Sequence, residues 1–251
     1  MKKNIIIVSV FLLIVSGLYN YINKKTLIKK KIVAGVMNGW YPFMFINNKN
    51  EYDGFDVDII KALEKELNRD IEIRDLGSLD SLFIALQQGS IDMVLSGLDI
   101  TEIRKNTYNM IYYAGFPCDT ITLLYKNKPL NDSILPCSVC VEGGSAVEKL
   151  PFSLNISSSI LASSLSEMIL QLEYEKVDSL ILENHVAETV KELKPLWYSK
   201  KIKRPDNFCI EGMGIAIEKN NKQLSLLVKQ GIKKLRELGV IEKFEKKWNI
   251  Q

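Results

Sequence analysis

The stretch SGLDITEIR, residues 96–104, follows a short apolar run, Ile91–Leu95, which predicts a buried parallel strand. After two small residues the stretch brings a carboxylate at Asp99 and a guanidinium at Arg104. A guanidinium can bind a carboxylate through two parallel hydrogen bonds, and a carboxylate can accept from an ammonium. One loop therefore carries the groups that an amino-acid zwitterion needs. The alternative, from these residues alone, is that Asp99 and Thr101 cap the next helix while Arg104 is solvated.

The composition is that of a globular protein. The chain has 251 residues, of which 47% are hydrophobic, so it can form one large domain or two small ones with real cores. Its net charge of +3 is small, and no basic stripe with interleaved aromatic residues is present. We therefore expect no nucleic-acid partner.

The N-terminal segment is typical of an export signal. Lys2 and Lys3 precede an apolar run, Ile5–Leu18, which has the length of a signal-peptide core and is short for a membrane span. The lysines between positions 24 and 31 have the wrong charge bias for export, although long domains translocate largely regardless of flanking charge. We expect residues 1–23 to be a signal peptide or an N-terminal membrane anchor. The protein is then periplasmic or extracytoplasmic, with or without an uncleaved tether.

The cysteines indicate neither a redox site nor a metal site. Cys118, Cys137, Cys140 and Cys209 allow three disulfide pairings, among which the sequence does not choose. The C-x-x-C pair straddles an apolar strand instead of opening a helix, and the one histidine, His185, is far away in sequence. We expect free thiols or one disulfide, with no metal and no cofactor.

From Lys31 onward, strands and helices alternate. Strand patterns at 32–37, 71–74 and 91–95 enclose helical patterns at 57–67 and 82–88, and this βαβαβ order predicts a parallel sheet. A second unit of the same type begins near Cys137.

The two units repeat one spacing. Segments 86–92 and 172–178 match in spacing, and each runs through apolar residues to a polar position, Ser96 in one unit and Glu183 in the other. Ligands of open α/β sheets bind beyond the carboxyl ends of the strands. Two such lobes facing each other would put both positions in one cleft.

Four motifs carry a family resemblance: GFDVD (54–58), SGLDIT with its following arginine (96–104), GMGIAI (212–217), and LRELG followed by FEKKW (235–248). In this order and spacing, the chain resembles the periplasmic solute-binding proteins that deliver polar amino acids to ABC importers. The histidine-, arginine-, lysine/arginine/ornithine- and glutamine-binding group is the most similar, and its arginine-binding members in particular. The resemblance covers the chain after about Lys30.

The resemblance implies an α/β fold, the two-lobed type II periplasmic-binding-protein flytrap with two hinge-crossing strands. The chain would cross near residues 116–122 and return near 209–215. Lobe 1 would then comprise residues 30–116 plus 211–251, and lobe 2 residues 117–210.

The resemblance also implies how the ligand's backbone is held. Arg104 matches the arginine that binds the α-carboxylate, and Ser96, Gly97 and Ser145 would close around it. Asp99 matches a position that receives the α-ammonium.

Three further positions complete the implied site. Glu183 would also receive the α-ammonium, in place of the usual aspartate. Trp40 matches the aromatic residue that stacks on the ligand side chain, and Leu79 the apolar lid opposite. Either hydrophobic residue could equally belong to the core.

The sequence defines the ligand's side chain less clearly than its backbone groups. Met37 stands where members that bind cationic side chains usually carry an acid, and a methionine cannot neutralise a guanidinium. Ala146 and Val147 replace polar residues that normally help to hold the carboxylate. We favour arginine held by other polar groups, or another polar amino acid, as the ligand. The alternative is a neutral or apolar amino acid that lies along Met37, Trp40 and Leu79.

The implied function is that of the extracytoplasmic substrate-binding protein of an amino-acid ABC transporter. It would bind a free amino acid, dock as a monomer on a membrane permease, and catalyse nothing. One alternative is an enzyme like cyclohexadienyl or arogenate dehydratase, with Glu183 or Glu142 as the acid. Another is an amino-acid sensor without a transport role.

Overall fold

The computed structural model describes residues 31–131 and 133–250 of the chain. The export segment predicted at residues 1–23 lies outside these residues. Among the helices of the described part, none is both long and apolar enough to cross a bilayer.

The first lobe is built on a five-stranded sheet with the strand order β4-β1-β5-β12-β6. The three strands β1, β4 and β5 run parallel, whereas β12 is antiparallel to both of its neighbours. The strands are β1 (Ile32–Val36), β4 (Ile71–Asp75), β5 (Met93–Val94), β6 (Tyr108–Ala114) and β12 (Met213–Glu218). A separate two-stranded hairpin pairs β2 (Phe45–Ile46) with β3 (Tyr52–Asp53).

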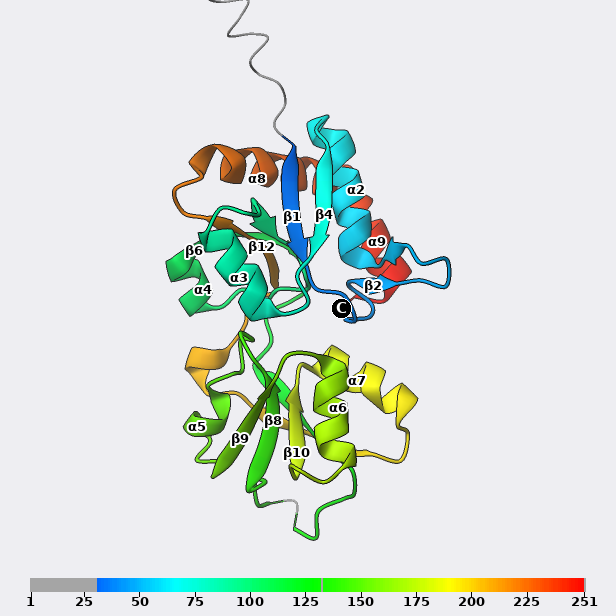
Figure 1. The fold of residues 1–251 in the computed structure, drawn as a ribbon, viewed down its shortest axis with the longest axis vertical. Helices are drawn as coiled ribbons and strands as arrows, with labels where there is room; N and C mark the ends of the chain where they lie inside the picture. The colour runs from blue at the N-terminus through cyan, green and yellow to red at the C-terminus, as the bar shows by residue number, and fades with distance from the viewer. Residues whose placement is uncertain (1–30, 132, 251) are drawn as a thin grey trace, which may run out of the picture. The chain divides into compact units, whose positions relative to one another are not determined.

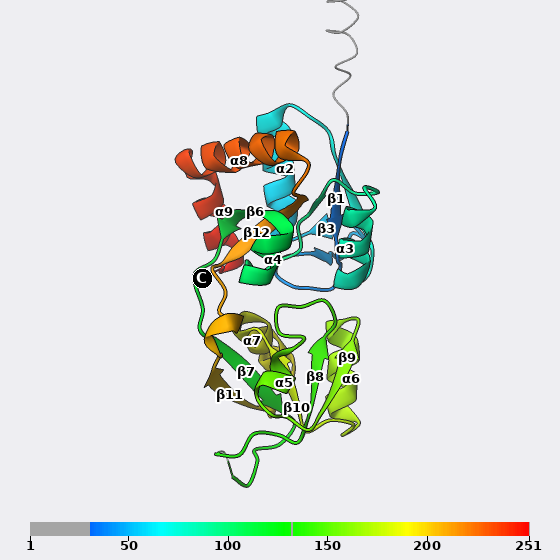
Figure 2. The same ribbon diagram turned by 90° about the vertical axis from the view of Figure 1, so that its left-hand side faces the viewer.

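Helices cover both faces of this sheet (Figures 1 and 2). The larger core lies under α2 (Phe55–Leu67), α8 (Lys222–Glu237) and α9 (Val240–Trp248). A second core lies under α3 (Leu79–Gln87), and α4 (Glu102–Thr107) leads directly into β6. The C-terminal helices thus pack on the same sheet as the N-terminal strands.

The second lobe is built on a sheet with the strand order β11-β7-β10-β8-β9, in which β8, β9 and β10 are parallel. Its strands are β7 (Thr120–Tyr125), β8 (Ser138–Glu142), β9 (Ser158–Ala162), β10 (Ser179–Leu182) and β11 (Tyr198–Lys203). Its helices are α5 (Leu150–Ser153), α6 (Leu165–Glu173) and α7 (Asn184–Leu193), followed by the short 3-10 turn η1 (Asp206–Phe208). Each face again carries its own hydrophobic core.

Two neighbouring chain segments connect the lobes. The backbone groups of Cys118 and Ile210 donate to each other, with N–O distances of 3.1 and 3.2 Å. The strands of the two sheets fall on either side of the lobe boundaries expected from the sequence, and the boundaries themselves stay a prediction.

All four cysteines are free.

The predicted alternation of strands and helices is confirmed, with two corrections. The strand expected at Ile91–Leu95 is only Met93–Val94. Both sheets are mixed and not purely parallel: β12 returns from the second lobe and inserts antiparallel between β5 and β6, and β7 runs antiparallel to its neighbours β10 and β11.

The motif at residues 54–58 joins three parts of the first lobe. Gly54 has φ of +127°, and a Cβ there would lie 2.3 Å from the carbonyl oxygen of Phe43. The backbone N–H of Asp56 donates to that same oxygen at 3.0 Å. Two residues further along, Asp58 accepts from the indole N–H of Trp248 at 2.7 Å, which ties α9 to α2. The first and last sequence motifs are therefore contact partners.

We predict that Gly54→Ala lowers the free energy of unfolding by at least about 2 kcal/mol, since the new methyl group meets backbone and also imposes a strained φ. Gly77→Ala is the matched control: Gly77 has φ of +75°, but a Cβ there meets nothing within 4 Å. The control isolates the conformational cost, about 1 kcal/mol. Urea denaturation measures both variants, and equal losses would show that the close approach at Gly54 is unimportant.

Candidate functional site

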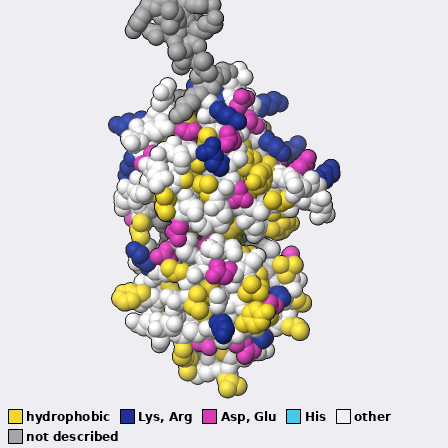
Figure 3. Space-filling view, viewed as in Figure 1, with side chains coloured by type: hydrophobic (Ala, Val, Ile, Leu, Met, Phe, Trp, Pro, Cys, Tyr) yellow, Lys and Arg dark blue, Asp and Glu magenta, His cyan; other side chains and the backbone are white. Residues whose placement is uncertain are grey.

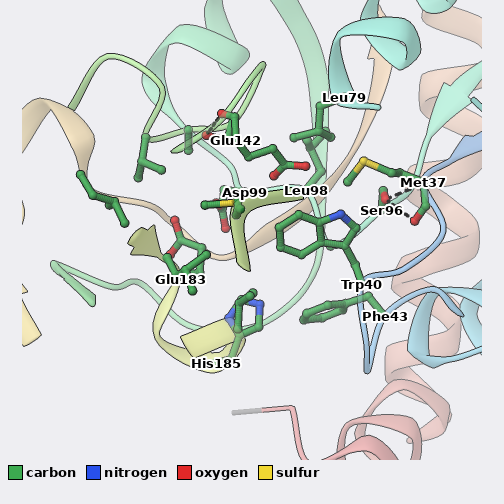
Figure 4. Close-up of a pocket in the computed structure, with 18 of the residues that line it drawn as sticks. Met37, Trp40, Phe43, Leu79, Ser96, Leu98, Asp99, Glu142, Glu183 and His185 are labelled. Carbon is green, nitrogen blue, oxygen red and sulfur yellow. Dashed lines mark hydrogen bonds between the residues drawn. The ribbon is translucent and has the colours of Figure 1, made fainter. Parts of the chain in front are cut away.

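A pocket with a cavity volume of about 60 Å³ lies between the two lobes. On the face in Figure 3, acidic side chains lie on both sides of the junction, and Figure 4 shows the pocket itself. The first lobe contributes Met37, Trp40, Phe43, Leu79, Ser96, Gly97, Leu98, Asp99 and Arg104. The second contributes Glu142, Ser145, Ala146, Val147, Met168, Ile181, Leu182, Glu183, His185 and Val186.

The structure brings all nine residues of the predicted site to this one pocket: Met37, Trp40, Leu79, Ser96, Gly97, Asp99, Arg104, Ser145 and Glu183. They come from both lobes and span nearly 150 positions of the sequence. Their roles toward a ligand stay predictions, and the contacts below show what each side chain is free to do.

Arg104 is buried, with 7% of its surface exposed. Its backbone N–H donates to the Thr101 side chain at 3.2 Å, so Thr101 does cap α4. Its guanidinium donates to the carbonyl oxygens of Asp99 and, across the lobe junction, Gly144, both at 2.9 Å. The guanidinium also lies 5.3 Å from the centre of the Phe83 ring. Its other N–H groups have no acceptor among the described residues and remain available to a ligand.

Glu183 is held by Arg204, which sequence reasoning missed. Arg204 is 1% exposed, and its Nη2 forms an ion pair with Glu183 Oε2. Nε of Arg204 donates to the carbonyl of Thr120 at 2.8 Å, and Nη1 to that of Phe208 at 3.3 Å. The second carboxylate oxygen of Glu183, Oε1, is buried and accepts from no N–H group in the described part of the chain, and the carboxyl groups of Glu183 and Asp99 can share a hydrogen bond when one of them is protonated.

Three carboxyl groups gather in the pocket. Asp99 lies between Glu142 and Glu183 in the view of Figure 4. Burial raises the pKa of Glu142 to about 8, and the neighbouring Asp99 adds to the effect. Burial, and then the Asp99 carboxylate, also raise the pKa of Glu183, against the opposing charge of Arg204. Because all three acids lose solvation, a ligand cation entering here would be strongly favoured.

The opposite wall is apolar. The Trp40 ring stands between Leu79, Phe43 and Met37 in Figure 4. Phe43 belongs to the core of the first lobe and also lines the pocket, where its ring and that of His185 form a T-shaped pair with a centroid distance of 5.0 Å. This wall suits the aliphatic part of a ligand side chain.

The small residues Ser96 and Gly97, in the loop of residues 96–104, already form hydrogen bonds within the protein. The N–H of Gly97 donates to Asp56 at 2.7 Å, and Ser96 Oγ accepts from the N–H of Met37 at 3.2 Å. The Ser145 hydroxyl donates to the carbonyl of Glu142 at 2.7 Å. Gly97 therefore shapes the pocket, and Ser145 reaches a ligand only by leaving that carbonyl.

Asp56 supports the pocket loop at Gly97 from inside the first lobe. It is fully buried and accepts from the Tyr113 hydroxyl at 2.6 Å as well as from Gly97. Burial raises the pKa of Asp56 to about 7, despite these two hydrogen bonds.

Two α/β lobes with a charged pocket at their junction define a flytrap-type binding protein. The sequence profile of the bacterial extracellular solute-binding proteins, family 3, matches residues 32–251, and the chain belongs to that family.

Several named relatives are similar along nearly the whole chain. A probable ABC transporter arginine-binding protein ArtJ of Chlamydia trachomatis is 27% identical over 225 residues, covering 88% of this chain and 86% of the relative. The arginine-binding extracellular protein ArtP of Bacillus subtilis is 26% identical over 234 residues, with coverage of 88% and 86%. The solved structure of the arginine-, lysine-, histidine-binding protein ArtJ from Geobacillus stearothermophilus has a TM-score of 0.75 at 27% identity, covering 87% of this chain and 95% of its own.

We predict that Asp56→Asn flattens the dependence of stability on pH. The raised pKa means that the folded chain binds one more proton than the unfolded chain between about pH 4 and 7, so Asp56 makes the protein less stable as pH rises toward 7. Between pH 5 and 7, the wild type should lose about 1.4 kcal/mol per pH unit more than the variant. Urea unfolding at several pH values measures both slopes, and parallel slopes would contradict the prediction.

Proposed function

We propose that this chain is the extracytoplasmic substrate-binding protein of an amino-acid ABC transporter, and that it closes around the backbone zwitterion of arginine or another polar amino acid. One observation carries the proposal: Arg104 from one lobe and Glu183 from the other line the same buried pocket, with Asp99 beside them. Arginine-binding proteins among the relatives support the choice of ligand.

The ligand's α-carboxylate would bind Arg104. The N–H groups of its guanidinium that no described residue accepts can form the paired hydrogen bonds that carboxylates prefer. The two carbonyls of Asp99 and Gly144 and the Phe83 ring hold the guanidinium in place. The Arg104 side chain is thus already oriented before the ligand arrives, so it loses little conformational entropy on binding.

The ligand's α-ammonium would bind between Asp99 and Glu183. Glu183 Oε1 is buried and accepts no hydrogen bond from an N–H group of the described chain, and its carboxyl group interacts with that of Asp99. An ammonium between the two ionised carboxylates would supply the donor that they lack. The two acids come from different lobes, and a cation between them favours the closed arrangement over the open one. Closure is then ligand-stabilised, because the zwitterion bonds both lobes at once.

The proposal extends to the lobes, partner and location. Residues 30–116 with 211–251 would move as one lobe and residues 117–210 as the other, about the paired segments at Cys118 and Ile210. The closed monomer would dock on a membrane permease from the periplasmic or extracytoplasmic side, either free or tethered by its N-terminal segment. A sensor without a transport role would use the same ligand chemistry, and permease docking distinguishes the two.

A catalytic role has one observation in its favour, namely that Glu142 is a buried acid whose raised pKa suits a general acid. Against it, a dicarboxylate substrate would place its second carboxylate among three acids. We therefore propose binding without catalysis, and incubation with prephenate or arogenate should yield no product.

We predict that a panel of α-amino acids will identify the ligand by thermal shift. A ligand at about 100 times its Kd stabilises by roughly 2.7 kcal/mol, which is readily visible as a rise in Tm. Agmatine, which lacks the α-carboxylate of arginine, and N-acetylarginine, which lacks the ammonium, are the controls and should give little shift. No shift with any amino acid, or an equal shift with agmatine, would refute the zwitterion site.

We predict that Arg104→Lys weakens binding of the identified amino acid by more than about tenfold, because an ammonium cannot form the paired hydrogen bonds of a guanidinium. Arg69→Lys, just beyond the end of α2 and outside the pocket, makes the same exchange and should bind as the wild type does. Titration calorimetry gives each Kd. If Arg104→Lys binds normally, the assignment of Arg104 is wrong.

A further inference from the structure

We propose that Glu142 is the specificity-determining residue that binds the cationic end of the ligand's side chain. The pocket would then select a positively charged amino acid over a neutral one of the same shape. This inference rests on the proposed function and adds the residue that recognises the side chain.

Glu142 is a buried acid without a partner. It is the last residue of β8, is 7% exposed and lines the pocket. Its Oε1 is buried and accepts no hydrogen bond from the described residues. A buried carboxyl group without a partner is costly, since the solvation it loses is not replaced. A cationic ligand would supply the missing partner.

The position of Glu142 suits the side chain and not the backbone of the ligand. In Figure 4 its carboxyl group points toward the gap between Leu79 and the Trp40 ring. These are the apolar surfaces along which the methylene groups of a long side chain would lie. Met37, which lies beside Leu79 and Trp40 in the same view, offers no charge. The acid that the sequence lacks at Met37 is thus supplied by the second lobe.

The charges of the pocket also favour a cation. Three carboxyl groups, of Asp99, Glu142 and Glu183, accompany two guanidinium groups, of Arg104 and Arg204. With Glu142 ionised these groups carry one net negative charge, and a cationic ligand side chain beside Glu142 would neutralise it. A zwitterion with a neutral side chain supplies no such charge, so Glu142 would keep its proton.

Glu142 could instead serve only as a counter-ion for Arg104. The geometry argues against this, because the guanidinium donates to two carbonyl oxygens and forms no ion pair with Glu142. A ligand α-carboxylate on Arg104 would moreover meet an ionised Glu142 with repulsion unless a cation lay between them.

The site predicts proton release on binding. The charged groups around Glu142 are Arg104 and Asp99 on the first lobe, the exposed Asp80 at the start of α3, and Glu183 on its own lobe. With its pKa raised to about 8, chiefly by burial, Glu142 carries a proton at pH 7 in the absence of ligand. A bound guanidinium or ammonium displaces that proton, and an uncharged side chain does not.

The test compares L-arginine with L-citrulline, whose urea group has nearly the same shape but no charge. For the full chain, calorimetry at pH 7 in buffers of different ionisation enthalpy should show nearly one more proton released with arginine than with citrulline. Any protons displaced by the α-ammonium are common to both ligands and cancel. The wild type should also bind arginine more tightly by at least roughly tenfold.

Glu142→Gln should abolish both differences while still binding citrulline. Glu188→Gln makes the same charge change on the exposed face of α7 and should behave as the wild type does. A preference for arginine that persists in Glu142→Gln overturns the proposal, as does a wild type with no difference in proton release. The proton count needs no variant, so it decides the matter even if Glu142→Gln fails to fold.

The same measurements separate this inference from the proposed function. If citrulline or another neutral amino acid binds the wild type as tightly as arginine does, the role of Glu142 is wrong while the binding function stands. If no amino acid binds, the proposed function itself fails.

Discussion

Buried charges of both signs at the junction of two lobes are the constraint on which this structure depends. Arg104 has 7% of its surface exposed and donates to a carbonyl from each lobe, while acids from both lobes surround it. Moving such groups out of water costs several kcal/mol each, and the attraction between them recovers only part of that cost. An apolar junction would be easier to stabilise. The charged junction is understandable if a dipolar ligand completes it, because the ligand then adds the partners that the protein alone lacks.

Supporting contacts hold the charged groups where a ligand would meet them. Asp56 fixes the loop at Gly97 from inside the first lobe, and Tyr113 orients Asp56. In the second lobe, Arg204 ties Glu183 to the backbone at Thr120, the first residue of β7 after the crossing segment. The acid on one side of the pocket is therefore coupled to the chain that connects the lobes.

Much of this arrangement could be predicted from the sequence, for identifiable reasons. Buried strands and amphipathic helices leave strong local patterns, so their order was predicted correctly. The family resemblance then located nine pocket residues that are far apart in the chain. The antiparallel insertion of β12 could not be predicted from periodicity, since it depends on where the returning chain pairs.

The residues that were missed had no local signal or a misleading one. Arg204 follows Lys200, Lys201 and Lys203 and resembles one more solvated cation, although it is 1% exposed. Glu142 was considered only as a candidate acid for catalysis. An acidic residue at the end of the apolar strand SVCVE is nevertheless a signal, because a strand that ends at a ligand site is where such a charge would lie.

The central claim is that one small molecule with both charges joins the two lobes through Arg104 and Glu183. A crystal structure of the protein with its tightest-binding amino acid tests this most directly. The account predicts the α-carboxylate on the Arg104 guanidinium and the α-ammonium within hydrogen-bond distance of Asp99 and Glu183. A ligand whose backbone lies elsewhere, or that contacts one lobe only, would contradict it.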